Sequence, residues 1–399
     1  MKVLLLNQFF HPDVAPTGQM ATELGEDLVR AGVDVTAVVS RGTYLGGVRL
    51  PRREEHAGIA IRRIPGTAFG KRSLLHRGLD YASFYASAAT ALARLPRHDV
   101  VIAMSTPPLI AAAGLAAKAR RGSRLVYWVQ DLYPAVAVAF GALREGSPVE
   151  RAMREVSRQV MRHADQVVVL GQSMAERVAD AGADPGRVRI IENWADGGKL
   201  CPVAHEENAL RAEAAGDAAF VVMYSGNIGR AHDVETIARA ARLLRDHREI
   251  RFVFQGDGAK RTEFEAATRG LENVRFAPYQ PADRLAEALS AADAHLVTLA
   301  PAVAGMLEPS KLYSVMAVGR PALYVGPLHA EAARTVERER CGFAFRNGDA
   351  SGLAEAIVGL SSDPARSADL GRLAREVFVA RYDRQIRTAQ FARMLRELP

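Results

Sequence analysis

The chain has 399 residues, of which 49% are hydrophobic and 24% are charged. This length predicts two or three domains, and the composition is globular, which excludes disorder, collagen and coiled coil as the main architecture. The net charge of +7 suits three kinds of partner: nucleic acid, an anionic membrane or a phosphorylated ligand. Two cysteines are too few for a disulfide framework, so we expect a reducing cytoplasm.

The positive charge is concentrated in one segment. Residues 41–80 hold nine Lys or Arg residues and three acidic residues, which accounts for +6 of the net +7. Neither zinc-finger spacing nor an aromatic-basic RNA-binding motif accompanies this charge, so we expect no nucleic-acid partner. Within the segment, residues 69–85 mix Lys71, Arg72 and Arg77 with apolar and aromatic side chains. This mixture is typical of an anionic membrane surface, although a surface loop followed by a core-packing helix explains it equally well.

The first half of the chain alternates short apolar runs with amphipathic stretches. Strands are predicted at residues 2–7, 33–39, 100–104, 125–129, 167–170 and 188–191. A helix over residues 20–31 ends at Gly32, and another helix begins near Leu109. Residues 100–117 are uncharged, but the Ser-Thr-Pro-Pro sequence in their middle predicts a strand, a turn and a helix rather than a membrane span.

A second half with the same alternation follows Trp194. Strands are predicted at residues 220–225, 251–255, 274–277, 294–299 and 321–325, and helices at 206–217, 234–244, 283–291, 353–360 and 384–398. Strands separated by helices indicate a doubly wound parallel sheet in each half. We therefore expect an α/β protein with two Rossmann-like domains that face each other across a cleft, where the ligand binds at the carboxyl ends of the strands.

The loop at residues 224–233 has the composition of a ligand-binding turn. It follows a predicted strand and opens a helix, and Gly226 and Gly229 let the backbone approach a ligand closely. The helix start offers free N–H groups to a phosphate, and Arg230 and His232 add possible hydrogen-bond donors. An ordinary strand-to-helix turn explains the same residues, so this loop alone does not establish a site.

Two more segments follow strands of the second half. Residues 255–258, Gln-Gly-Asp-Gly, repeat the glycine-rich arrangement, although a tight turn explains them as well. In residues 308–321, Glu308, Ser310 and Lys311 lie at a predicted helix start, where a phosphate would meet backbone N–H groups, a hydroxyl and an ammonium. The alternative is a well-capped structural helix with a surface lysine.

Together these segments resemble retaining glycosyltransferase family 4, whose members have the GT-B fold of two Rossmann-like domains. The resemblance runs nearly end to end, and it is carried by Pro16–Gln19, Gln130–Pro134, Ile190–Trp194, Ser225–Gly229, Gln255–Gly258 and Pro309–Ser314. The Asp-Leu-Tyr-Pro and Pro-Ser-Lys elements resemble the subgroup that builds bacterial surface polysaccharides, often on polyprenyl-diphosphate carriers.

The resemblance implies a hexosyl or N-acetylhexosaminyl transferase. Such an enzyme moves a sugar from a nucleotide-diphosphate sugar, here expected to be UDP-linked, to a hydroxyl of a lipid-linked or other sugar acceptor. It retains the configuration at the anomeric carbon and uses no metal or other cofactor. Residues 1–198, with a C-terminal helix at about 382–399, would bind the acceptor, and residues 199–381 the nucleotide sugar. We expect a cytoplasmic enzyme, peripheral on the inner face of the membrane.

The resemblance also assigns residues. Arg230 and Lys311 would stabilise charge on the diphosphate, and Asp131 would orient the acceptor hydroxyl or accept its proton. As an alternative, Asp131 caps the turn before Pro134. The expected donor-binding residues are Gly18, Gly226, Asn227, Gly229, Gly256, Asp257, Gly258, Pro278, Tyr279, Glu308, Ser310 and Leu312. The expected acceptor or membrane side consists of His11, Thr17, Lys71, Arg72 and Arg77.

The sequence departs from the family pattern at two places. Many members carry two glutamates, separated by seven residues, before a Met-Ala-x-Gly turn, and Met306 and Ser314 stand at these positions here. Glu308 is offset by two residues and does not inherit the role by position. The common Arg and Lys after the first strand of the second half are replaced by Asn227 and His232.

Three other functions remain open at this point. The first is a transferase that acts on a soluble small-molecule or antibiotic-type acceptor. The second is a non-transferring enzyme of the same architecture, such as a nucleotide-sugar epimerase. The third is a two-domain solute-binding protein, although the apolar start of the chain turns polar at once and predicts no secretory signal. The order and spacing of the motifs favour the transferase.

Overall fold

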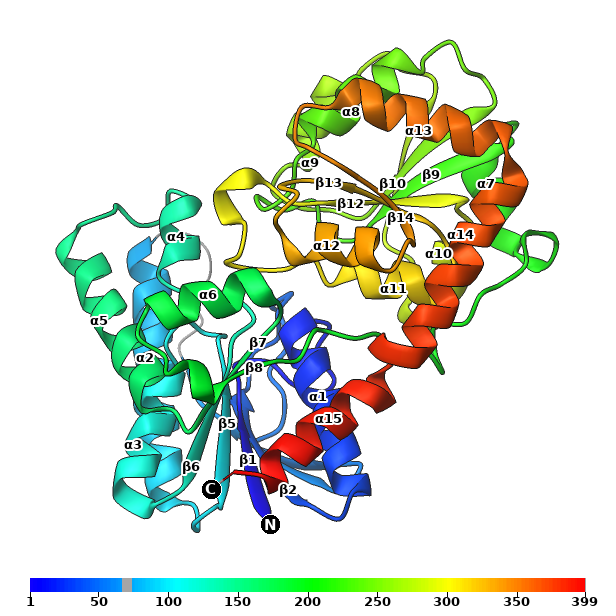
Figure 1. Cartoon of the computed structure of the whole chain (residues 1–399). Helices are drawn as coiled ribbons and strands as arrows, with labels where there is room; N and C mark the ends of the chain where they lie inside the picture. Colours follow the sequence, from blue (N-terminus) through cyan, green and yellow to red (C-terminus); the bar gives the residue numbers. More distant parts are fainter. Residues whose placement is uncertain (67–73, 399) are drawn as a thin grey trace. The chain divides into compact units, whose positions relative to one another are not determined.

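The computed structural model describes residues 1–66 and 74–398, without the side chains of residues 74–79. It divides the chain into two compact units. Unit 1 comprises Met1–Glu192 and Thr388–Pro399, and unit 2 comprises Asn193–Arg387. The domain limits expected from the sequence, at 198/199 and 381/382, lie a few residues from these boundaries. Each unit is an α/β structure built on its own sheet (Figure 1).

Unit 1 contains a sheet of eight strands in the order β3-β4-β2-β1-β5-β6-β7-β8. The strands are β1 (Lys2–Leu6), β2 (Asp34–Ser40), β3 (Arg53–His56), β4 (Ile59–Ile64), β5 (Val100–Met104), β6 (Arg124–Trp128), β7 (Gln166–Val169) and β8 (Val188–Ile190). The helices are α1 (Pro16–Arg30), α2 (Leu74–Arg94), α3 (Ala111–Arg121), α4 (Ala135–Ala139), α5 (Pro148–His163) and α6 (Gln172–Asp180). All neighbouring strands are parallel except the pair β3 and β4, which is antiparallel.

The central strand β1 shows why a continuous apolar run predicts this sheet. Val3 pairs with Val35 of β2 on one side and with Val100 of β5 on the other. Because helices cover both faces of the sheet, the side chains of residues 3–6 are all buried and all apolar. Strand β3 was not predicted, since its sequence Arg-Glu-Glu-His lies at the sheet edge and keeps polar side chains in contact with water.

The C-terminal residues of the chain complete unit 1. Helix α15 (Arg384–Arg396) brings Phe391 to Trp128, with ring centroids 4.9 Å apart. Both side chains are fully buried. The expected return of the last helix to the first domain is therefore observed.

Unit 2 contains a sheet of six strands in the order β11-β10-β9-β12-β13-β14, all parallel. The strands are β9 (Phe220–Ser225), β10 (Ile250–Gln255), β11 (Val274–Ala277), β12 (Ala294–Thr298), β13 (Ala322–Val325) and β14 (Gly342–Phe345). The helices are α7 (Ala209–Ala215), α8 (Glu235–Leu243), α9 (Arg261–Ala267), α10 (Leu285–Ser290), α11 (Lys311–Ala317), α12 (Glu331–Arg338), α13 (Ala350–Ser362) and α14 (Pro364–Val377). Short 3₁₀ turns lie at Pro185–Arg187, His205–Glu207, Ala282–Arg284 and Pro301–Val303, and a π-helical turn lies at Phe378–Tyr382.

Strand β9 separates the two apolar layers of unit 2. Phe220, Val222 and Tyr224 belong to the core shared with α8 and α13, whereas Val221 and Met223 belong to the core shared with α7 and α10. This alternation follows from the period of two along a strand, and apolar residues at both phases place β9 at the centre of the sheet.

The strand order identifies where a ligand binds in each unit. Counted from the first strand, the order in unit 2 is 3-2-1-4-5-6, and the parallel strands of unit 1 from β4 onward follow the same scheme. The expected pair of Rossmann-like domains is thus confirmed. In such sheets ligands bind beyond the carboxyl ends of the strands, where the order reverses. The reversal falls between β9 and β12 in unit 2 and between β1 and β5 in unit 1.

Candidate active site

The glycine-rich loops after β9 and β10 in unit 2 lie against each other. Gly226 N–H donates to the carbonyl of Gln255 at 2.9 Å. Gly256 has φ +136, and a Cβ atom there would lie 2.1 Å from the carbonyl oxygen of Gly226. Only glycine permits both the backbone conformation and this approach. The contact between the two loops therefore explains Gly256 without a ligand, as the alternative of a tight turn also did.

The following residues extend the same contact. A Cβ atom on Gly258 would lie 2.5 Å from the Asn227 side-chain oxygen and 2.5 Å from the Ile228 carbonyl oxygen. Tyr279, in the loop after β11, approaches Gly256 and donates its hydroxyl hydrogen to the carbonyl of Asp257 at 3.4 Å.

The structure thus brings most of the predicted donor-binding loops of unit 2 together. This set comprises Gly226, Asn227, Gly229, Gly256, Asp257, Gly258, Pro278 and Tyr279. Tyr279 is 54% exposed.

Lys311 lies next to these loops. Its Nζ is 3.6 Å from the ring centroid of Tyr224, and a Cβ atom on Gly226 would lie 3.7 Å from this Nζ. The ammonium is buried, and within residues 1–66 and 74–398 it has no hydrogen-bond partner. Burial lowers the pKa of Lys311 well below its usual value, because the charged form loses its hydration. A buried donor without a hydrogen-bond partner is costly, so an acceptor bound at this position would stabilise the charged form of Lys311.

His232 is held as a neutral imidazole beside Lys311. Its Nδ1 lies 3.0 Å from the carbonyl oxygen of Thr298, and since a carbonyl only accepts, Nδ1 carries the proton. Burial first, and then the charge of Lys311, lower the pKa of His232 to about 3. The Nε2 atom is then an acceptor, which corrects the expectation that His232 adds a donor toward the ligand. The hydrogen bond to Thr298 also connects the loop after β9 with the end of β12. These are the two strands between which the strand order reverses.

Lys260 was not singled out from the sequence. Its Nζ donates to the carbonyl of His232 at 2.8 Å and fixes the loop after β9 from the side of α9. A lysine two residues after the Gly258 turn could have indicated a role in this loop region. Its contact with His232 could not be predicted, because the two residues are far apart in the sequence.

Arg230 lies on the same loop as His232, and its side chain is exposed. The ammonium of Lys311, by contrast, is buried. The two predicted diphosphate residues therefore belong to one edge of unit 2 but have different environments.

The segment around Glu308 differs from the expectation. The Glu308 carboxylate accepts from the N–H groups of Glu331 and Ala332, both at 3.4 Å, at the start of α12. Burial, together with the nearby Glu331, raises the pKa of Glu308 to about 8. Leu312 is 1% exposed and packs into the core, so its side chain is not available to a ligand. Ser310 precedes the first residue of α11 and makes no side-chain cap bond.

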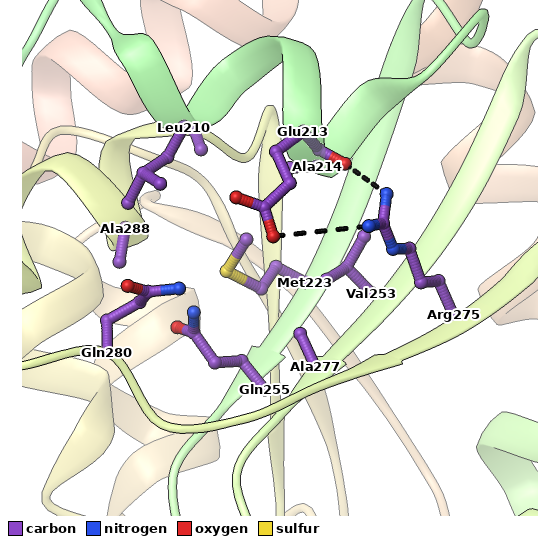
Figure 2. A pocket seen from close by; sticks show the side chains of 11 residues that line it. Leu210, Glu213, Ala214, Met223, Val253, Gln255, Arg275, Ala277, Gln280 and Ala288 are labelled. Carbon is purple, nitrogen blue, oxygen red and sulfur yellow. Dashed lines mark hydrogen bonds and ion pairs between the residues drawn. The ribbon is translucent and has the colours of Figure 1, made fainter.

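A separate pocket lies on the α7 and α10 face of the sheet (Figure 2). Met223 and Val253 form apolar lining, the carboxamides of Gln255 and Gln280 lie in it, and the Glu213–Arg275 ion pair, 4.0 Å long, borders it. The pocket shares Gln255 with the glycine-rich turn but does not include Lys311. The pocket is therefore distinct from the position of the Lys311 ammonium.

In unit 1, Asp131 follows β6 beyond the carboxyl end of the sheet. The backbone N–H groups of Gln130 and Asp131 both donate to the hydroxyl of Ser105, at 3.1 and 3.0 Å. Burial raises the pKa of Asp131 to about 6. Among the described residues no group donates a hydrogen bond to its carboxylate, so the alternative role as a cap of the turn before Pro134 has no support.

The predicted acceptor side is described in part. The His11 ring stacks on His56 with centroids 3.6 Å apart, and burial followed by the charge of His56 lowers the pKa of His11. Gly18 is buried under Phe9, where a Cβ atom would lie 3.0 Å from the Phe9 Cβ, so packing alone explains this glycine. Thr17 is half-buried in the first turn of α1.

The cationic part of the predicted acceptor side, Lys71, Arg72 and the side chain of Arg77, lies outside the described residues. No described helix is both long and apolar enough to cross a membrane. Groups of three or more His, Cys, Asp or Glu side chains placed to bind a metal are also absent from the described part of the chain.

Comparison with known proteins identifies the family to which the chain belongs. The chain matches the model of a glycosyl transferase 4-like domain over residues 17–194 and that of glycosyl transferases group 1 over residues 219–363. It is 29% identical over 353 residues to WcaI of Escherichia coli strain K12, whose name assigns it to colanic acid biosynthesis, covering 84% of this chain and 86% of WcaI. It is 29% identical over 333 residues to WbjE of Pseudomonas aeruginosa, named as a glycosyltransferase, covering 82% of each.

Solved structures share the fold. Sucrose-phosphate synthase from Thermosynechococcus elongatus superposes with a TM-score of 0.79 at 17% identity, over 100% of this chain and 99% of that chain. Anabaena HepE, solved in complex with UDP, gives a TM-score of 0.74 at 18% identity over 100% of both chains. The chain therefore belongs to the glycosyltransferases with the GT-B fold, with a glycosyl transferase 4-like domain followed by a glycosyl transferase group 1 domain.

Proposed function

We propose that the protein transfers a hexosyl or N-acetylhexosaminyl group from a UDP-linked sugar to a hydroxyl of a lipid-linked sugar acceptor, with retention at the anomeric carbon. The observation that carries the proposal is Lys311, a buried ammonium without a hydrogen-bond partner among the described residues, next to Tyr224 and Gly226 of the glycine-rich loop after β9. A diphosphate is the ligand that such a position suits, since it supplies charge and several acceptors at once. The UDP bound by Anabaena HepE supports the choice of nucleotide.

The reaction follows from these groups. The bond between the anomeric carbon and the diphosphate breaks, and the electron pair leaves with the diphosphate. Lys311 and Arg230 stabilise this charge, in place of a metal ion. The acceptor hydroxyl forms the new bond on the same face of the sugar, and its proton passes to Asp131 or to the departing diphosphate. Because the pKa of Asp131 is about 6, its carboxylate is available as a base at neutral pH.

The names of two relatives support the acceptor class. WcaI is named for colanic acid biosynthesis, a surface-polysaccharide process, and both WcaI and WbjE are similar to this chain over most of its length. We therefore place the protein in surface-polysaccharide assembly, on the cytoplasmic face of the membrane. The acceptor would be a sugar carried on a lipid diphosphate.

Thermal unfolding with a panel of nucleotides and nucleotide sugars tests the donor. UDP and one UDP-sugar should raise the unfolding temperature without added metal, and EDTA should leave the shift unchanged. Nuclear magnetic resonance of the product then reports the anomeric configuration. A protein that no nucleotide stabilises is not a nucleotide-sugar transferase, and a product of inverted configuration contradicts retention.

A further inference from the structure

Exposed apolar side chains gather on two loops of unit 1. Leu45 is 80% exposed, Val48 58%, Tyr44 42% and Val14 53%. Three of these residues follow β2 and the fourth follows β1. Strands β1 and β2 are parallel neighbours, so both loops leave the carboxyl edge of the sheet together.

The residues after β2 form a hairpin, residues 41–50, rather than a loose loop. Leu50 N–H donates to the Arg41 carbonyl at 2.9 Å, and Gly42 and Arg49 form an antiparallel bridge. Gly46 and Gly47, with φ of +79 and +81, turn the chain at its tip. The tip therefore presents Leu45 and Val48 in a defined conformation.

The hairpin is fixed to the loop after β1. Tyr44 N–H donates to the Asp13 carboxylate at 2.8 Å, and the Tyr44 ring meets the Phe9 ring edge to face at 5.7 Å. The second carboxylate oxygen of Asp13 accepts from Ala15 N–H at 3.0 Å. Asp13 is buried by these contacts, so it adds little negative charge to the surface.

The charge around the tip is of one sign. Residues 41–53 contain four arginines, Arg41, Arg49, Arg52 and Arg53, and no acidic residue. Arg49, Arg52 and Arg53 are exposed. Arg53 pairs with Arg62 across β3 and β4, which places a fifth arginine at the same end of the sheet.

We propose that residues 41–53, together with Val14, dock on an anionic phospholipid bilayer. Leu45 and Val48 insert at the boundary between headgroups and acyl chains, and the arginines bind lipid phosphates. An apolar tip on a segment that carries four arginines matches this boundary, where apolar area and attraction to anionic lipid add together. Glu54 and Glu55 follow this segment on β3, and Glu54 is paired with Arg63. This segment is a different part of the sequence from residues 69–85, and the proposal does not depend on the identity of the transferred sugar.

Vesicle co-sedimentation of the full chain tests the proposal. The wild type should bind vesicles with about one third phosphatidylglycerol, should bind purely phosphatidylcholine vesicles far more weakly, and should be released by about 0.5 M salt. The double variant R49S/R52S should lower the partition coefficient about fivefold for each arginine removed. The double variant L45S/V48S should lower it at least about tenfold.

Matched controls use exposed side chains on other elements of unit 1. Val149 is 60% exposed, close to the value for Val48, and Val149→Ser should leave binding unchanged. Arg120 is an exposed arginine near the C-terminus of α3, and Arg120→Ser should also bind as the wild type does. A loss of binding in these controls equal to that in the hairpin variants would overturn the proposal.

A tryptophan at the tip reports insertion directly. The two native tryptophans, Trp128 and Trp194, are 0% and 4% exposed, so they form a nearly constant background. Leu45→Trp emission should shift to shorter wavelength with anionic vesicles. An unchanged spectrum overturns the proposal. So does binding that only a Lys71→Ser/Arg72→Ser variant abolishes, or binding that requires a polyprenyl phosphate in the vesicle, since the occupant would then be the acceptor lipid.

Discussion

At the scale of single residues, the protein keeps ionisable groups in environments that oppose their charge. Asp131 has a pKa of about 6 because it is buried. If its carboxylate is the base, kcat/KM should fall about tenfold per pH unit below pH 6, because only the ionised form accepts a proton. Asp131→Asn should lower kcat/KM about 10²- to 10⁴-fold and leave UDP stabilisation of unit 2 unchanged. Near-normal turnover by this variant would remove Asp131 from the mechanism.

Glu308 should make the free energy of unfolding depend on pH. Its folded-state pKa of about 8 lies above the ordinary value of 4.5, so the folded state holds a proton that the unfolded state loses. This contribution is complete below pH 4.5 and is lost as the pH rises through 8. Glu308→Gln should therefore reduce the loss of unfolding free energy between pH 6 and 9 by about 1–3 kcal/mol.

Urea unfolding followed by Trp194 fluorescence in a Trp128→Phe background measures this difference, because Trp194 belongs to unit 2. The exposed Glu263→Gln on α9 serves as the control and should keep the wild-type dependence. An unchanged pH dependence in Glu308→Gln would show that Glu308 is not the group that titrates.

At the scale of elements, the site depends on two loops that touch through glycine. Gly256→Ala would place a Cβ atom 2.1 Å from the carbonyl oxygen of Gly226. The variant should destabilise unit 2 by about 1–3 kcal/mol and weaken UDP binding. Gly270 has a similar positive φ, +80, with nothing within 4 Å of the added atom. Gly270→Ala should cost about 1 kcal/mol and keep UDP binding; equal effects of the two variants would contradict the argument.

Many of these elements could be predicted from the sequence because buried parallel strands are continuous apolar runs. Strands β3, β4 and β14 were not predicted. Strand β4 carries two arginines, Arg62 and Arg63, which interrupt its apolar pattern. Strand β3 is polar because it lies at an edge, and β14 begins at Gly342, where the chain passes so close to Ala322 that a Cβ atom would lie 1.9 Å from its carbonyl oxygen. Neither position has the apolar pattern on which strand prediction depends.

The candidate site likewise contains features that could be predicted from the sequence and others that could not. Glycine-rich turns and Lys311 could be recognised, because their residue types suit phosphate. The contacts that decide their chemistry could not, since they join distant parts of the chain: Lys311 with Tyr224, and His232 with Thr298. Glu308 was expected at the ligand but contacts a helix that begins at Glu331.

At the scale of the whole molecule, the chain ends in the unit where it begins. Phe391 covers Trp128, and both are fully buried. Phe391→Ala should destabilise unit 1 by about 3–5 kcal/mol. In a Trp194→Phe background, Trp128 fluorescence follows unit 1 alone. Ile386→Ala, at a side chain that is 45% exposed on the same helix, should change little. If Phe391→Ala and Ile386→Ala were equally stable, the packing of Phe391 on Trp128 would not stabilise unit 1.

The central claim is that Lys311 binds the diphosphate of the donor. Isothermal titration calorimetry with UDP and with uridine tests it most directly, using Lys311→Met to keep the length of the buried side chain. We expect the variant to bind UDP about 10- to 100-fold more weakly, because a charged hydrogen bond is lost, and to bind uridine unchanged. Equal affinities of the wild type and Lys311→Met for UDP would contradict the account.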